Sequence, residues 1–131
     1  MLKFTDKVVG KAEFEVTEND IENIIITSFE GGSNYWMGVD NSTKEWENKP
    51  EDEPISTWAT KLILDGKKVK LFDIEETDDQ DEEWNLTLDK ILKGIGLNIK
   101  HRSFDADLEN MDATTADCII QYALFGEVVY G

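Results

Sequence analysis

The chain of 131 residues is long enough for one domain with a hydrophobic core, because a domain of this size buries roughly two-thirds of its unfolded surface. Asp and Glu outnumber Lys and Arg by 29 to 13, and the resulting formal net charge of −16 argues against direct binding to nucleic acid or to an anionic membrane. No apolar run approaches the ~20 residues that span a bilayer, and the first residues lack the apolar stretch of a signal peptide. We therefore expect a cytosolic protein with a single globular domain over residues 1–131.

The first sixteen residues predict a β-hairpin. Apolar side chains alternate along residues 11–16, as expected of a strand with one buried face. Residues 2–9 are the expected partner strand, and Gly10 lies between the two at the turn. We therefore expect the chain to begin with two antiparallel strands.

A helix is predicted directly after this hairpin. Thr17 can cap its first turn, and Asp20 occupies the place of the Glu in a capping box. Gly31 and Gly32 are expected to end the helix. Its inward face would consist of Ile21, Ile24, Ile25 and Phe29.

The next stretch predicts a short strand and a long loop. Residues 34–39 are aromatic enough for a strand, whereas residues 40–54 are polar, acidic and contain both prolines. Residues 55–72 then allow two interpretations, a helix that Ser56 can cap and that runs to about Leu64, or a hairpin around Asp65–Gly66. The apolar spacing favours the helix, and residues 69–74 form a strand in either case.

The acidic run from Asp73 to Glu83 contains eight carboxylates in eleven residues, which predicts a solvated loop. A calcium-binding loop of the EF-hand type does not fit, because Trp84 stands where the turn needs Gly and Lys90 stands where the bidentate Glu belongs. We expect no metal at this run.

A third helix follows the acidic run. Thr87 can cap it while Leu86 packs against Ile91 one turn later. Gly94 and Gly96 are expected to weaken this helix. Its apolar face would consist of Leu88, Ile91, Leu92, Ile95 and Ile99.

The last helix is predicted to lie at the centre of the fold. Asp112 can cap its start, and Gly126 suits the left-handed residue that ends it. Two adjacent apolar stripes cover most of its circumference, which leaves mainly Thr114, Asp117 and Gln121 for water or hydrogen-bonded contacts. The stripes consist of Ala116, Ile119, Ile120, Ala123 and Leu124, and of Cys118, Tyr122 and Phe125.

Residues 127–130 are expected to form an extended edge strand after this helix. Together these elements predict an α+β fold, with a small antiparallel sheet packed by about four helices.

No pattern in the sequence predicts an enzyme. His101 and Cys118 are the only histidine and cysteine, and nothing in their spacing pairs them as a base and a thiolate nucleophile. The carboxylates are too numerous for any two to be singled out as acid and base. We expect no catalytic residue, no cofactor and no metal.

Tryptophans in acidic surroundings indicate a different kind of site. Aromatic side chains rimmed by carboxylates are typical of a surface that anchors a basic protein partner. The alternative is that each tryptophan folds back to close the core. The predicted partner-binding residues are Tyr35, Trp36, Trp46, Asp78, Asp79, Asp81, Glu82, Glu83 and Trp84.

Three stretches carry a resemblance to a known family: residues 29–36 (Phe-Glu-Gly-Gly-Ser-Asn-Tyr-Trp), residues 86–94 and residues 116–131. They resemble an uncharacterised family of small acidic proteins encoded by phages and integrated mobile elements of Firmicutes. The acidic loops 40–54 and 73–83 lie outside these stretches. The resemblance implies an accessory gene expressed in a bacterial cytoplasm, and it carries over no activity or catalytic residue.

Charge and resemblance together favour a non-enzymatic protein that binds a basic host protein. The most specific hypothesis is an anti-restriction or anti-CRISPR inhibitor whose acidic surface mimics DNA and occupies a nuclease. The alternative is a structural or adaptor phage protein, dimeric through the 128–130 edge, whose acidity serves only solubility. Both a monomer and a homodimer are compatible with the sequence.

Overall fold

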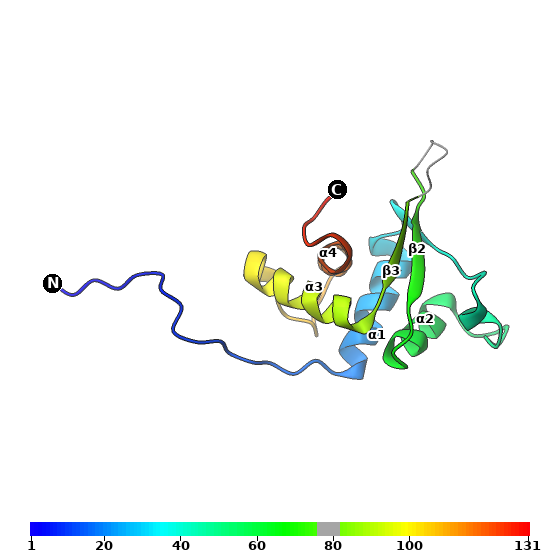
Figure 1. The fold of residues 1–131 in the computed structure, drawn as a ribbon, viewed down its shortest axis with the longest axis horizontal. Coiled ribbons are helices and arrows are strands. Elements are labelled where there is room, and N and C mark those ends of the chain that lie inside the picture. Colours follow the sequence, from blue (N-terminus) through cyan, green and yellow to red (C-terminus); the bar gives the residue numbers. More distant parts are fainter. Residues whose placement is uncertain (76–81) are drawn as a thin grey trace.

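The computed structural model of the protein describes residues 1–75 and 82–131. The described residues form four α-helices and one three-stranded antiparallel sheet (Figure 1), which confirms the predicted α+β fold. The helices are α1 (Glu18–Thr27), α2 (Ile55–Leu64), α3 (Leu88–His101) and α4 (Ala113–Phe125). The strands are β1 (Met37–Val39), β2 (Val69–Asp73) and β3 (Glu83–Leu86), and three short helical turns are η1 (Ser28–Gly32), η2 (Lys44–Trp46) and η3 (Ser103–Asp105).

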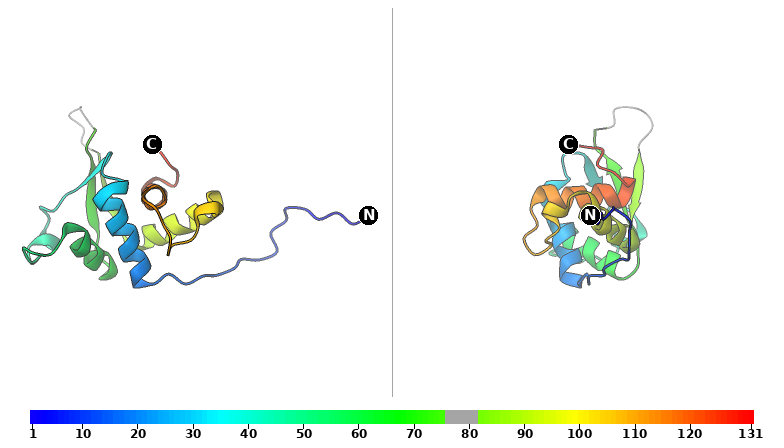
Figure 2. Two further views of the ribbon diagram at one scale, coloured as in Figure 1. Left: turned by 180° about the vertical axis from the view of Figure 1, so that it is seen from behind. Right: turned by 90° about the vertical axis from the view of Figure 1, so that its left-hand side faces the viewer.

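Helix α4 lies at the centre, between α3 on one side and α1 with the sheet on the other (Figures 1 and 2). Its residues 115–123 are all buried. The Asp112 side chain accepts the backbone N–H of Thr115 at 2.8 Å, and Gly126 ends the helix with a φ of 74°. The predicted caps and central position are therefore confirmed.

Helix α3 packs closely on α4 because Gly94 has no side chain. A Cβ atom at this position would clash with the backbone oxygen of Ile119 and lie 2.9 Å from the backbone nitrogen of Ala123. Helix α3 nevertheless continues unbroken through Gly94 and Gly96 to His101. Gly94 permits a close helix contact that a larger residue would prevent.

The sheet has the order β1–β2–β3, so β2 pairs on both sides. Phe72 lies opposite Gly38 of β1 and opposite Glu83 of β3. Strand β3 was not predicted, because residues 83–86 were assigned to the acidic loop and to the approach of α3. Its alternation is short: Leu86 is buried and Trp84 is half-buried, while Glu83 and Asn85 are exposed.

Helix α1 begins as predicted, with a capping box in which Thr17 and Asp20 exchange bonds of 3.1 and 2.9 Å. The chain then continues through η1 to Gly32, where a Cβ atom would lie only 2.6 Å from the backbone oxygen of Ala113. Gly32 thus allows the end of η1 to pass close to the start of α4, whereas a Cβ atom at Gly31 would meet nothing within 4 Å.

Residues 55–64 form the favoured helix, α2, rather than a hairpin. Gly66 ends it with a φ of 81°, and the N–H of Lys67 returns to the carbonyl of Leu62 at 2.9 Å. The cap prediction at Ser56 is wrong, because Pro54 occupies the cap position and the Ser56 hydroxyl instead donates to Glu30 at 2.8 Å.

Residues 1–16 form an extended arm that leaves the body at the start of α1 (Figure 1). We refer to these residues as the N-terminal arm. The predicted hairpin is wrong, since residues 1–15 are exposed and lack secondary structure. An isolated two-stranded hairpin is marginal in water, and the arm has no third strand beside it to cover the apolar face.

Candidate functional site

The acidic run is carried by the hairpin of β2 and β3. The N–H of Asp73 donates to the carbonyl of Glu82 at 3.1 Å, and Lys70 pairs with Glu83 at 3.5 Å. We name Asp73, Glu75, Glu82 and Glu83 the hairpin carboxylates. Asp73 is half-buried and the other three are exposed. The predicted partner-binding residues Asp78, Asp79 and Asp81 lie outside the residues that the structure describes.

Tyr130 connects these carboxylates to the C-terminal segment. Its hydroxyl donates to Oδ2 of Asp73 at 2.8 Å. Its ring stacks on Trp36, with the ring centroids 4.6 Å apart and the planes 8° from parallel. The pKa of Tyr130 is raised, first by burial and then by the hydrogen bond to Asp73, and the charges of Asp73, Glu82 and Glu75 add to this shift.

Four aromatic side chains pack together where the hairpin meets α4 and the C-terminal segment. We name Trp36, Trp84, Phe125 and Tyr130 the aromatic cluster. Trp84 of β3 meets Trp36 edge-on at 5.5 Å and Phe125 at 5.1 Å between ring centroids. Such contacts hold rings in fixed relative orientations, so the cluster joins β3 to α4.

Asp117 of α4 is the polar centre beneath this cluster. Although it is only 6% exposed, its Oδ1 accepts bonds from Ser33 Oγ at 2.7 Å and Trp36 Nε1 at 2.8 Å. Its Oδ2 accepts bonds from the Tyr35 hydroxyl at 2.8 Å and Gln121 Nε2 at 3.0 Å. Four donors satisfy the buried carboxylate, which suits a structural role rather than that of a catalytic base.

The same network perturbs Tyr35. Its pKa is raised from 10.0 to about 12, first by burial and then by its hydrogen bond to the Asp117 carboxylate. The ring is still 44% exposed, so Tyr35 can reach solvent while its hydroxyl is held inside.

Gln121 fastens the C-terminal segment to α4. Its Oε1 accepts the backbone N–H groups of Val129 and Tyr130, both at 2.7 Å, and its Nε2 donates to the carbonyl of Tyr130 at 3.1 Å. The predicted edge strand at residues 127–130 is wrong, because these backbone groups bond to a side chain instead of a neighbouring strand. A dimer through this backbone edge would first have to break those bonds.

The predicted aromatic anchors do not form one exposed patch. Trp36 is fully buried, whereas Tyr35 and the half-buried Trp84 lie near it around α4. Trp46 lies elsewhere, in η2, where it too is buried. Its indole nitrogen has no hydrogen-bond partner among the described residues. Closure of the core, the alternative considered for each tryptophan, therefore describes Trp36 and Trp46.

The raised thiol pKa of Cys118 and the ring contact of His101 suit structural roles. Burial raises the pKa of the Cys118 thiol, an effect that the nearby Arg102 opposes and Asp117 reinforces. The thiol therefore stays protonated and weakly nucleophilic at neutral pH. The exposed ring of His101 stacks on Tyr122 at 5.8 Å between centroids.

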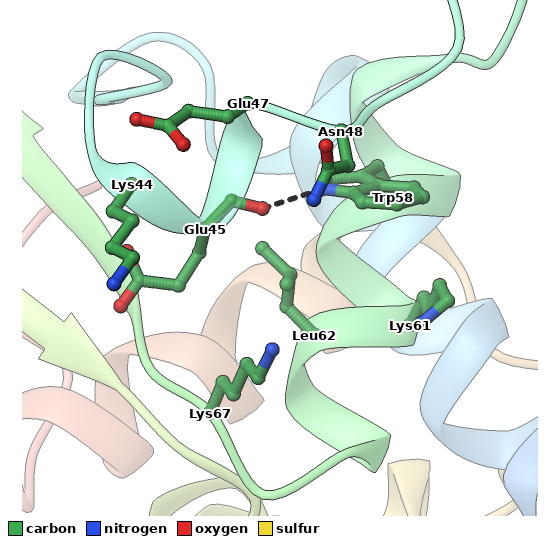
Figure 3. A pocket seen from close by; sticks show the side chains of 8 residues that line it. All are labelled: Lys44, Glu45, Glu47, Asn48, Trp58, Lys61, Leu62 and Lys67. Atoms are coloured by element: carbon green, nitrogen blue, oxygen red, sulfur yellow. Dashed lines mark hydrogen bonds between the residues drawn. The ribbon is translucent and has the colours of Figure 1, made fainter.

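A pocket of about 520 Å³ between η2 and α2 was not predicted (Figure 3). Trp58 forms part of its wall and donates its indole N–H to the carbonyl of Glu45 at 3.0 Å. Its lining combines three lysines with two glutamates, so its charge selects neither anions nor cations. No local pattern could reveal it, because the lining comes from three separate segments. The lining residues are Lys44, Glu45, Glu47, Asn48, Trp58, Lys61, Leu62 and Lys67.

Sequence reasoning also missed the roles of Asp73, Tyr130 and Gln121. Of these three, only Gln121 has a local signal in the sequence. It lies four positions after Asp117, and both are polar residues on an otherwise apolar helix. Polar groups at such positions need partners, but the sequence does not name them.

Within residues 1–75 and 82–131, no three His, Cys, Asp or Glu side chains are grouped so that they could hold a metal ion. In the same part of the chain, no helix combines the length and the apolar character needed to cross a membrane. Comparisons with known protein families, with curated proteins and with solved structures give no match.

Proposed function

We propose that the protein acts by binding a basic protein partner through the acidic end of the β2–β3 hairpin. The observation that carries this proposal is the position of the hairpin carboxylates, at the end of a hairpin that rises past α1 and α2 (Figure 1). The net charge of −16 extends the negative field beyond the hairpin. Such a field attracts a basic surface and accelerates association at low salt.

The anchoring of the hairpin supports a binding role over a purely solubilising one. A charge that serves only solubility needs no fixed position, yet Asp73 is held by Tyr130, and Trp84 is packed in the aromatic cluster. Fixed charges pay less conformational entropy when a partner binds.

The most specific form of the proposal is an anti-restriction or anti-CRISPR inhibitor that occupies the DNA-binding cleft of a nuclease. Duplex DNA presents about one negative charge per 1.7 Å of its axis, so a cleft that binds DNA attracts a dense group of carboxylates. The resemblance to phage-encoded and mobile-element proteins supports this context, in which the protein would act in a bacterial cytoplasm. Stretches 29–36 and 116–131, which carry that resemblance, supply the Asp117 network and three rings of the aromatic cluster.

Inhibition of purified nucleases tests the proposal. The full chain is added to a panel of restriction endonucleases and CRISPR effector nucleases, and DNA cleavage and DNA binding are both measured. We expect at least one nuclease to lose cleavage, with inhibition competed by added duplex DNA. Binding without competition by DNA would favour the adaptor alternative, and failure across a panel from the bacterial host would contradict the inhibitor.

A further inference from the structure

The N-terminal arm exposes apolar side chains that the rest of the chain does not cover. Phe4 is 92% exposed and Phe14 is 50% exposed. Residues 12, 14 and 16 are apolar and alternate with Lys11, Glu13 and Glu15, as in a strand with one apolar face. The arm therefore has the pattern of a strand but no neighbour to pair with.

Strand β1 lies at an open edge of the sheet, where a further strand could pair. Because β2 occupies the centre of the sheet, β1 pairs with β2 alone among the residues that the structure describes. On the side that faces β2, the N–H of Ile74 donates to the carbonyl of Trp36, and the N–H of Asp40 donates to the carbonyl of Lys70. Since this alternation continues along an antiparallel strand, Val39 directs its N–H and C=O toward the open edge.

A groove of about 350 Å³ accompanies this edge. Phe29, Met37, Val39 and Ile55 provide its apolar lining, and Ile55 is exposed. An open edge beside an apolar groove is the arrangement that binds an extended peptide as an added strand. The remaining lining residues are Glu30, Asn34, Gly38 and Ser56.

The first part of the arm carries charge opposite to that of the body, whereas the segment that would dock, residues 11–16, has Glu13 and Glu15 against Lys11. Residues 1–12 contain Lys3, Lys7 and Lys11 against the single acid Asp6, in a chain whose net charge is −16. Glu30 lines the groove. The basic part of the arm is thus attracted to the acidic body of the same protein.

The arm cannot deliver Phe14 to the groove of its own chain. Phe14 lies three residues before Thr17, which allows a reach of roughly 10 Å in an extended chain. Helix α1, with its 10 residues, separates Thr17 from the η1 residue Phe29 by about 15 Å along its axis. The arm also leaves the body on the side away from the sheet (Figure 2).

We propose that residues 11–16 of one copy add as a strand to the β1 edge of a second copy, with Phe14 in the groove beside Ile55. Reciprocal exchange of two arms would give a two-fold symmetric dimer, the commonest closed assembly. The predicted strand at residues 11–16 would then form between chains rather than within one.

Sedimentation equilibrium of the full chain tests this proposal. We expect a dimer that dissociates on dilution, and we expect Phe14→Ser and Ile55→Ser each to raise the dimer dissociation constant by about tenfold or more. Phe104→Ser is the control, because Phe104 is a large apolar residue that is 78% exposed but lies in η3, and it should leave the constant unchanged.

Cross-linking identifies the contact itself. A bis-maleimide reagent is applied to an equimolar mixture of Phe14→Cys and Ile55→Cys chains, and a covalent product joining one of each is expected. A monomer at all concentrations up to about 1 mM would overturn the proposal. So would a dimer that both Ser variants leave intact, or a cross-link that forms only within a chain carrying both cysteines.

Discussion

The hydroxyl of Tyr130 donates to Asp73 across 57 positions of the sequence, at 2.8 Å. This bond joins the C-terminal segment to the hairpin that carries the acidic run. Gln121 holds the backbone of Tyr130 from the other side, with its Oε1 at 2.7 Å from the backbone nitrogen. Helix α4, the C-terminal segment and the hairpin therefore form one connected unit.

Tyr130→Phe should make the β2–β3 hairpin less stable while the aromatic cluster stays packed. The substitution removes the hydroxyl bonded to Asp73 but keeps the ring that stacks on Trp36. We expect a loss of roughly 0.5–1.5 kcal/mol in the free energy of unfolding, as for one net hydrogen bond. Amide hydrogen exchange should quicken in β2 and β3 more than in α4. Equal acceleration in both elements, or none in the hairpin, would refute the link.

Alkaline pH should destabilise the protein through two tyrosines. Burial and carboxylate neighbours raise the pKa of Tyr35 to about 12 and raise that of Tyr130 above its ordinary value of 10.0. A raised pKa means that the folded state keeps a proton that the unfolded state releases. The stabilising effect is thus complete below pH 10 and is lost as the pH rises through the folded pKa values.

The free energy of unfolding, measured between pH 9 and about pH 12, should therefore fall less steeply in a variant with Tyr35→Phe and Tyr130→Phe than in the native protein. Tyr122→Phe serves as a control for the loss of a tyrosine hydroxyl elsewhere. Identical slopes in the native protein and the double variant would rule out this explanation.

Gly94→Ala and Gly96→Ala should have opposite effects although the two glycines are only two residues apart on α3. A Cβ atom at Gly94 clashes with the backbone of Ile119, whereas a Cβ atom at Gly96 has nothing within 4 Å. Overpacking at Gly94 should cost roughly 1–3 kcal/mol. The better helix propensity of Ala should stabilise at Gly96 by up to about 1 kcal/mol. Urea denaturation measures both, and a stabilising Gly94→Ala would contradict the close α3–α4 contact.

Local signals account for the parts of the fold that were predicted correctly. The starts of α1 and α4 depend on caps within three residues, at Thr17 and Asp112, and the apolar spacing of α4 follows from its own sequence. Strand β3 and the arm were misassigned because strand pairing depends on which distant segment lies alongside. Residues 11–16 do alternate between apolar and charged side chains, yet no strand among the described residues pairs with them.

The candidate site was harder to predict than the fold. Asp117 receives its bonds from Ser33, Tyr35 and Trp36, which lie more than 80 positions earlier. The polar position on α4 was visible in sequence, but its partners were not. Trp36 follows the Gly31–Gly32 turn, which favours an exposed anchor, yet in the structure it is fully buried and donates its indole N–H to Asp117.

The central claim is that the acidic run binds a basic partner, and neutralising it tests this most directly. A hairpin variant with Asp78→Asn, Asp79→Asn, Asp81→Asn and Glu82→Gln removes four negative charges from the −16 of the chain, which leaves −12. A control variant with Glu22→Gln, Asp89→Asn, Glu109→Gln and Glu127→Gln reaches the same net charge through exposed residues outside the acidic run.

The decisive measurement is the dissociation constant for the inhibited nuclease at salt concentrations from about 50 to about 200 mM. We expect the native protein and the control to bind more weakly as salt rises, and the hairpin variant to bind at least about tenfold more weakly with a shallower salt dependence. Equal affinities and equal salt slopes for the hairpin and control variants would contradict the claim and leave the acidic run a solubilising feature.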